Sequence, residues 1–196
     1  MEGKTAGPGA PGTTGRGAPW FLRPATVADI PALEVLIPLS VRKLQAATYS
    51  LAQIEAALGT VFGVDRQLIL DGSYYIAQSG DAIIGCGGWS RRRTLFGSDH
   101  APAKDDSFLD PAMEPARVRA FFVHPEWARL GIGRAILARS EAAAAAMGFE
   151  TLELAATLAG VPLYTAAGFA AVETIAVPLE NGETLPVVRM RKSLSR

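Results

Sequence analysis

The segment from Phe121 to Met147 restricts the fold more than any other part of this 196-residue chain. It begins with an apolar run, continues through a turn that contains Gly131 and Gly133, and ends in an alanine-rich stretch followed by Gly148. Apolar runs bounded by turn residues are typical of strands, and alanine is the best helix former. The segment therefore predicts a strand, a tight glycine turn and a helix that ends at a glycine cap.

The segments on either side of this unit predict further strands and two hairpins. The first hairpin turns at 79–81, and the second turns at the Asn181-Gly182 pair, a strong hairpin signal. The order of elements predicts a mixed α/β (α+β) fold with antiparallel hairpins at both ends and one strand–helix–strand unit in the middle. The predicted strands are 20–23, 73–78, 82–89, 118–123, 152–156, 171–177 and 184–190.

Capping residues mark the helices of the first half of the chain. Asp29 predicts the start of a helix that runs toward Leu39. Ser50 and Gln53 form a capping box for a second helix, which places Leu51 on its apolar face. Asp65 predicts the cap of a short helical turn before residue 70, and a further short helix is predicted over 162–167.

Two segments predict irregular structure. Residues 1–19 contain six glycines and three prolines and predict a flexible tail, which leaves 20–196 as one domain. Residues 91–115 are polar, contain three prolines and predict a long loop. Loops of this length in a compact domain tend to be functional or disordered.

Charge and composition exclude several classes of protein. The 19 basic and 19 acidic residues give a net charge of zero, which does not favour nucleic-acid binding. One cysteine, Cys86, and two histidines cannot form a disulfide framework or an ordinary structural zinc site. No apolar run is long enough to span a membrane, and the N-terminus lacks a signal-peptide core. We therefore expect a cytoplasmic protein.

The glycine turn predicts a phosphate-binding site. The first turn of a helix has free backbone N–H groups and a positive dipole end, and glycines let a phosphate approach them. A nucleoside-triphosphate loop would need a lysine that is absent here. A dinucleotide loop would need a third glycine where Ile136 stands. Coenzyme A, with its pyrophosphate and long pantetheine arm, is the third ligand that suits such a turn.

Two motifs in this order resemble the GNAT superfamily of N-acetyltransferases. The first is the run from Val123 to Arg134, and the second is Tyr164 followed by Gly168-Phe169. The resemblance covers about residues 20–192. It implies a mixed, mostly antiparallel central sheet flanked by helices, with acetyl-CoA as the cosubstrate and no metal.

The resemblance also implies roles for individual residues. Tyr164 is the expected catalytic acid that protonates the leaving thiolate, and the amide of Val123 is the expected oxyanion donor. The pantetheine arm would follow the backbone of Phe121, Phe122 and Val123 in a gap between two strands. The pyrophosphate would bind the backbone of Arg129, Leu130, Gly131, Ile132, Gly133 and Arg134, and the guanidinium of Arg129 or Arg134 could add charge-assisted bonds.

The sequence departs from the family pattern at four positions. Ala128 and Arg129 stand where the family usually has Arg or Gln followed by Gly, and Thr157 stands where it often has Asn. Arg117 stands where some members have a glutamate base, and an arginine cannot accept a proton at neutral pH. The base stays unassigned, and a water chain is one alternative. The side-chain candidates in or near the long loop are Asp99, His100, Asp105, Asp106 and Glu114.

These observations predict an acetyl-CoA-dependent N-acetyltransferase that acts on a small-molecule amine. One alternative is a non-catalytic module that binds or senses acyl-CoA. Another is a protein acetyltransferase that acts on a lysine or an N-terminus. We also expect a homodimer that pairs through the edge strand of the Asn181-Gly182 hairpin.

Overall fold

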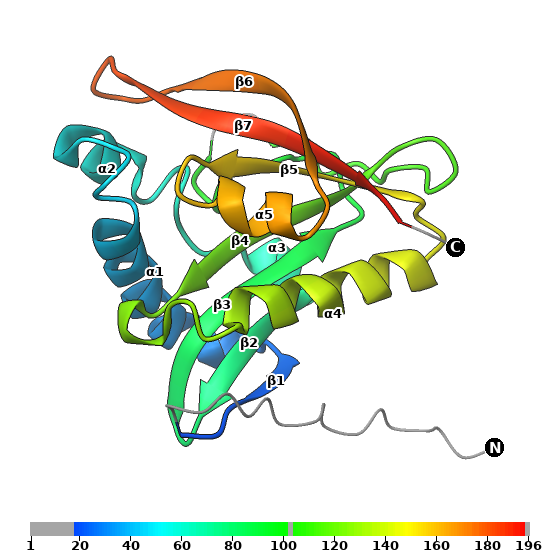
Figure 1. The fold of residues 1–196 in the computed structure, drawn as a ribbon, viewed down its shortest axis with the longest axis horizontal. Coiled ribbons are helices and arrows are strands. Elements are labelled where there is room, and N and C mark those ends of the chain that lie inside the picture. The colour runs from blue at the N-terminus through cyan, green and yellow to red at the C-terminus, as the bar shows by residue number, and fades with distance from the viewer. Residues whose placement is uncertain (1–17, 102–103, 195–196) are drawn as a thin grey trace.

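The computed structural model describes residues 18–101 and 104–194, which form a seven-stranded sheet with helices on both faces (Figure 1). Residues 1–17, which make up most of the predicted tail, lie outside the described residues. The elements in chain order are β1 (Phe21–Pro24), the 3-10 turn η1 (Val27–Asp29), α1 (Ile30–Leu44), α2 (Leu51–Ala57), α3 (Arg66–Leu70), β2 (Tyr74–Ser79), β3 (Ala82–Ser90), β4 (Ala116–Val123), the 3-10 turn η2 (Pro125–Trp127), α4 (Ile132–Ala146), β5 (Thr151–Thr157), α5 (Val161–Ala166), β6 (Ala170–Pro178) and β7 (Thr184–Ser193).

The sheet has the strand order β1-β2-β3-β4-β5-β7-β6. Neighbouring strands are antiparallel except β4 and β5, which are parallel and are connected through α4. A parallel pair needs a long crossover, and the alanine-rich helix provides it. The predicted mixed, mostly antiparallel sheet flanked by helices is confirmed.

The core has two layers, one on each face of the sheet. Tyr74 and Ile76 of β2 pack in the layer that contains side chains of α1, α2 and α3. Tyr75 and Ala77 of the same strand pack in the layer of α4 and α5. Successive residues of a strand point to opposite faces, so each buried strand contributes to both layers.

Two details of the helices differ from the prediction. The helix predicted from Asp29 is present, but it ends at Leu44 and not at Leu39, because it continues through Pro38. Several buried side chains on this stretch hold the helix on the sheet, and tertiary packing outweighs the helix-breaking effect of a proline. Leu51, predicted on a buried face, is 72% exposed because it starts α2 beyond the edge of the core.

Both predicted hairpins are present. The β2–β3 hairpin turns at 79–81, and the β6–β7 hairpin turns at 179–183, where Gly182 has a positive φ of 83°. β6 forms one edge of the sheet and most of its residues are exposed. The homodimer expected at this edge stays a prediction.

The helices are short. The longest that the structure describes, α1 and α4, have 15 residues each, whereas a membrane span takes about 20 apolar residues. Across residues 18–101 and 104–194, no helix has the length and apolar character to cross a bilayer.

Candidate active site

The parallel strands β4 and β5 pair at only one end. Their ladder joins Ala116 to Leu152 and Arg117 to Glu153, and no further pair continues it in the described residues. An ion pair between Arg117 and Glu153 reinforces this closed end. The remainder of β4 pairs with β3 on its other side. The strands therefore part, and an extended ligand could pair with the backbone of β4 in the gap, as an added strand does.

A bulge in β4 lies beside this gap. Ala120 has a φ of +57°, and the register against β3 shifts around it. The Tyr74 hydroxyl donates a 2.8 Å hydrogen bond to the Ala120 carbonyl and thereby holds the bulge. A Cβ atom at Gly87, on the facing strand, would lie 2.7 Å from the Phe121 ring, so this position requires glycine. Bulges redirect the side chains that follow them.

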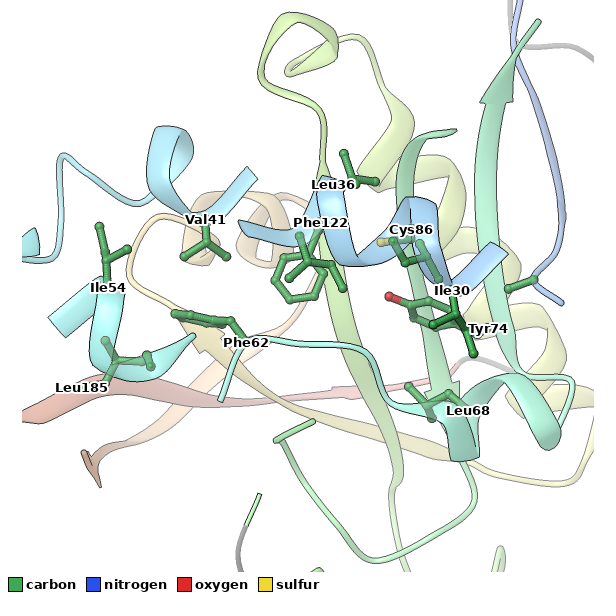
Figure 2. Close-up of a cluster of buried hydrophobic side chains, with 14 of the residues drawn as sticks. Ile30, Leu36, Val41, Ile54, Phe62, Leu68, Tyr74, Cys86, Phe122 and Leu185 are labelled. Carbon is green, nitrogen blue, oxygen red and sulfur yellow. The ribbon is translucent and has the colours of Figure 1, made fainter. Parts of the chain in front are cut away.

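The two residues after the bulge point to opposite faces of the sheet. The Phe121 ring lies 6.1 Å, centroid to centroid, from the Tyr164 ring of α5. The Phe122 ring lies 6.3 Å from the Phe62 ring, in the layer under α1 (Figure 2). At Phe121 and Phe122, β4 therefore separates the space beside α5 from the space beneath α1.

The glycine turn has the geometry of an anion-binding loop. Arg129 and Gly131 have positive φ angles of 65° and 86°, and α4 starts at the next residue. The first backbone bond into this helix runs from the Ala135 amide to the Gly131 carbonyl, at 3.0 Å. The three preceding amides have no carbonyl one turn earlier in the helix and face the turn. Arg129 adopts the left-handed backbone conformation at the position where GNAT sequences usually have glycine.

The predicted catalytic tyrosine lies at the gap. Tyr164 is on α5, and its ring packs between Phe121 and Phe169, whose centroid is 5.8 Å away. The side chain is 8% exposed, and burial raises the pKa of its hydroxyl. The phenol therefore remains protonated at neutral pH and can donate a proton. Gly133, where a Cβ would lie 3.2 Å from the Leu163 side chain, allows α5 to pack closely against the start of α4.

The amide of Val123, the expected oxyanion donor, is already hydrogen-bonded. It donates to the Ser40 hydroxyl oxygen of α1 at 3.1 Å. Ser40 is buried, and α1 crosses this end of β4. The amide can serve an oxyanion only if Ser40 gives up this bond. Sequence reasoning missed Ser40, because nothing in the chain pattern indicates which residue of α1 reaches β4.

A cavity of about 460 Å³ lies on the α1 side of the sheet. One wall is α1, and the opposite wall combines the segment between α2 and α3 with part of the long loop. Phe62 lines the cavity and contacts Phe122, so the cavity borders the second face of β4. Its lining residues are Glu34, Ile37, Pro38, Leu58, Gly59, Phe62, Gly63, Val64, Arg66, Ser98, Asp99 and His100.

Backbone hydrogen bonds attach the long loop to the opposite wall. The Ser98 amide donates to the Thr60 carbonyl at 2.8 Å, and the Asp99 amide donates to the Val64 carbonyl at 2.9 Å. The Asp99 carboxylate accepts a 2.8 Å bond from the Arg66 amide and lies 3.5 Å from its guanidinium. The sequence left the role of loop 91–115 open, and the structure places its residues Ser98, Asp99 and His100 in the cavity lining.

The five predicted base candidates fall into two groups. Asp99 and His100 line the cavity, whereas Asp105, Asp106 and Glu114 are absent from its lining. Asp105 accepts hydrogen bonds from Ser107, and Glu114 forms an ion pair with Arg93. Arg117 closes the β4–β5 gap and cannot replace a glutamate base. The sequence prediction missed Glu34, which lies on α1 far from the glycine motif in the chain.

These features define two binding surfaces of different chemistry. The gap and the glycine turn offer backbone groups and a helix N-terminus, which suit an extended ligand with a diphosphate. The cavity offers carboxylates, an imidazole and apolar side chains, which suit a small ligand with a basic group. The residues that the structure describes contain no group of three or more His, Cys, Asp or Glu side chains placed to bind a metal ion.

Comparison with known proteins shows the family of this chain. A family model described as an acetyltransferase (GNAT) domain matches residues 71–171, which is more than half of the chain and includes both β4 and the glycine turn. No curated protein matches the chain in sequence.

Solved structures share the fold at low sequence identity. A GCN5-related N-acetyltransferase from Rhodopseudomonas palustris is 22% identical, with a TM-score of 0.67 over 93% of this chain and 100% of that one. The PaiA N-acetyltransferase from Thermoplasma acidophilum, solved with coenzyme A, is 16% identical, with a TM-score of 0.62 over 89% and 99%. A ribosomal-protein-alanine N-acetyltransferase from Brucella melitensis is 19% identical, with a TM-score of 0.57 over 89% and 99%.

Proposed function

We propose that this chain, which belongs to the GNAT family and is an N-acetyltransferase, transfers the acetyl group of acetyl-CoA to the amine of a small molecule. The observation that carries this proposal is the parting of β4 from β5 beside the glycine turn at the start of α4. An extended arm with a terminal diphosphate fits this combination of a free strand edge and a helix N-terminus.

The coenzyme binds along β4 and the turn. Its pantetheine arm pairs with the backbone of Phe121–Val123 in the gap, and its pyrophosphate accepts hydrogen bonds from the amides of the Arg129–Arg134 segment. The guanidinium groups of Arg129 and Arg134 add charge-assisted bonds. The PaiA enzyme, which shares this fold, was solved with coenzyme A, and that likeness supports the placement.

The acceptor reaches the thioester from the cavity. Phe121 and Phe122 are neighbours on β4, and they face Tyr164 and the cavity wall respectively. A thioester at this level of the gap lies between the proton donor and the cavity. The cavity of about 460 Å³ has the size of a small-molecule site. Its confinement between α1 and the long loop supports a small amine over a lysine of a folded protein.

The transfer removes two protons from the amine nitrogen and delivers one proton to the departing thiolate. The protonated amine first loses one proton, and its nitrogen then attacks the thioester carbonyl, forming the C–N bond. Collapse of the tetrahedral intermediate breaks the C–S bond, and Tyr164 protonates the departing thiolate. The nitrogen loses its second proton as the amide forms, which restores the tyrosine through the solvent. Removal of a proton by a positioned base typically contributes about 10²–10⁴-fold to a rate.

His100 is the base that we propose. Of the two predicted candidates at the cavity, Asp99 already accepts bonds from the Arg66 amide and faces its guanidinium. His100 follows directly, and its backbone amide is held by the Ser98 hydroxyl at 3.2 Å. An imidazole is a common general base, and this one lines the cavity from the wall opposite α1.

The test is turnover with acetyl-CoA, read by release of the free thiol over a panel of primary amines, amino acids and lysine peptides. We expect release that depends on a small amine, together with a product heavier by one acetyl group. Acetyl-CoA binding without any turnover would favour the non-catalytic acyl-CoA module. Turnover with peptides alone would favour a protein acetyltransferase.

A further inference from the structure

Glu34 and Pro38 lie one helical turn apart on α1, and both line the cavity. Proline has no backbone N–H, so the Glu34 carbonyl lacks the donor that normally bonds it four residues later. The Glu34 carbonyl is therefore an acceptor without its usual helix partner, on a residue that lines the cavity.

Glu34 is exposed at the opening of this cavity, and its carboxylate is the cavity's unpaired charge. Four titratable side chains line it: Glu34, Arg66, Asp99 and His100. Arg66 and Asp99 face each other at 3.5 Å, and their charges offset. Among the residues that the structure describes, no cation forms an ion pair with Glu34. The carboxylate is therefore free to pair with a protonated amine that enters the cavity.

Glu34 lies beside the part of β4 at which we propose that the thioester reacts. Ser40, six residues later on α1, bonds the Val123 amide, and six residues span about 9 Å along a helix. Ile30, at the other end of α1, lies beside Tyr74, whose hydroxyl bonds the Ala120 carbonyl (Figure 2). α1 therefore runs along β4 from the bulge toward Val123, with Glu34 between these two points.

The rest of the cavity is mostly apolar. Leu58, Phe62 and Val64 form part of the wall opposite α1, and Ile37 adds to the α1 side. These side chains can cover an apolar body of the acceptor, and burial of such a body is favourable by about 25 cal/mol per Å². A carboxylate on the ligand would find no free cation, because Arg66, the one arginine or lysine among the described lining residues, already faces Asp99.

We propose that the acceptor is a primary monoamine with an apolar or aromatic body, and that Glu34 determines this specificity. Its carboxylate and its main-chain carbonyl bind the ammonium group, and His100 on the opposite wall takes the proton before the nitrogen attacks. This inference rests on the proposed function, because it names the substrate class of the same site.

Calorimetry with phenethylamine tests the binding step apart from catalysis. With coenzyme A bound, we expect phenethylamine to bind, and Glu34→Gln to weaken it by tenfold or more with unchanged coenzyme affinity. Glu55→Gln, an exposed glutamate of α2 outside the cavity, is the matched control and should bind as the parent does. Equal binding by the Glu34 variant and the parent would overturn the proposal, as would tighter binding of phenylalanine or spermidine than of phenethylamine.

Kinetics then separate recognition from catalysis. For phenethylamine as acceptor, Glu34→Gln should raise KM by tenfold or more and change kcat by less than about threefold, as loss of uniform binding does. A fall in kcat with an unchanged KM would make Glu34 part of the chemical step and overturn the recognition role. If no amine is acetylated, the proposed function fails, but the calorimetric result still decides whether this cavity binds a monoamine.

Discussion

The proposed coenzyme side and the proposed acceptor side of this site are built differently. The proposed coenzyme side is one contiguous segment, Phe121–Arg134, which supplies mainly backbone groups from a strand, a turn and a helix start. The proposed acceptor side combines α1, the segment before α3 and the tip of the long loop, and it supplies side chains. A diphosphate can be bound by amides that every residue carries, whereas an amine with a particular body must be recognised by particular side chains.

The difference extends to how each side is held in place. The turn depends on local conformation, namely the positive φ angles at Arg129 and Gly131. The cavity wall depends on contacts between distant segments, such as the Ser98 to Thr60 and Asp99 to Val64 hydrogen bonds. Substitutions on the two sides should therefore affect different measurements, and the following predictions test that separation.

The largest effect is expected at Tyr164, where the two sides meet. Tyr164→Phe keeps the ring between Phe121 and Phe169 and removes the hydroxyl, so turnover should fall by at least about 10²-fold. Acetyl-CoA affinity should change little. Tyr75→Phe, which removes the hydroxyl of another buried tyrosine in the same layer, is the control and should retain activity. Steady-state kinetics together with calorimetry measure both quantities.

Two results would contradict the acid role of Tyr164. A loss of less than a few-fold would make this residue a packing residue and leave proton donation to water. A loss of coenzyme affinity as large as the loss of turnover would show that the hydroxyl holds the coenzyme.

A tenfold or greater loss of acetyl-CoA affinity is expected for Gly131→Glu, which corresponds to about 1.4 kcal/mol or more. The new carboxylate would repel the diphosphate at the start of α4. Gly131→Ala is the control: an added Cβ meets no atom within 4 Å, but φ is +86°, so alanine introduces backbone strain without charge. Calorimetry with acetyl-CoA should show a much smaller loss for alanine than for glutamate.

This substitution also tests the separation of the two sides. Phenethylamine binding at the cavity in the absence of coenzyme should be the same for Gly131→Glu and the parent. Unchanged acetyl-CoA affinity in a folded Gly131→Glu variant would remove the turn from the coenzyme site.

The smallest effect is expected for Asp29, at the start of α1, and it concerns the stability of the fold. α1 forms one wall of the cavity. Asp29 accepts hydrogen bonds from Arg23 and Thr26, and chiefly through Arg23 its pKa is lowered to about 2. Because the folded pKa lies below the unfolded value of about 3.9, the ionised carboxylate stabilises the fold above about pH 4. This contribution, about 2 kcal/mol at most, is lost as the pH falls through about 2.

Asp29→Asn should therefore lower the free energy of unfolding at pH 7 and reduce the acid dependence between about pH 4 and pH 2. Urea unfolding at a series of pH values measures this difference, with Asp81→Asn at an exposed hairpin as the control. Acetyl-CoA affinity at pH 7 should stay the same in the folded variant. An Asn variant as stable as the parent at pH 7 would contradict the stabilising role of the pair.

Sequence reasoning was most successful where the interactions are local. Ser50 and Gln53 form the predicted capping box, and Asp65 caps α3 through the Gln67 amide. The strand, glycine turn and alanine-rich helix from Phe121 to Met147 also follow the prediction, within a residue or two at each end. These features depend on residues a few positions apart, so the chain itself carries the information.

Reasoning from the sequence was less successful where one segment acts on another. α1 continues past Pro38 because its buried face packs on the sheet, and a local rule for proline would end it sooner. The contact of Ser40 with the Val123 amide joins residues 83 positions apart. No periodicity or motif indicates such a pair.

The sequence by itself determined the fold class, the glycine turn at the start of a helix and the short helix that carries Tyr164. Each of these depends on backbone conformation or on spacing within a short segment. The family resemblance implied a gap between two strands, which the structure shows between β4 and β5. Only the tertiary structure decided that Phe121 and Phe122 face two different spaces, and that Glu34 and His100 line the same cavity. These facts depend on how the layers pack on the sheet, and packing places residues together without regard to their separation along the chain.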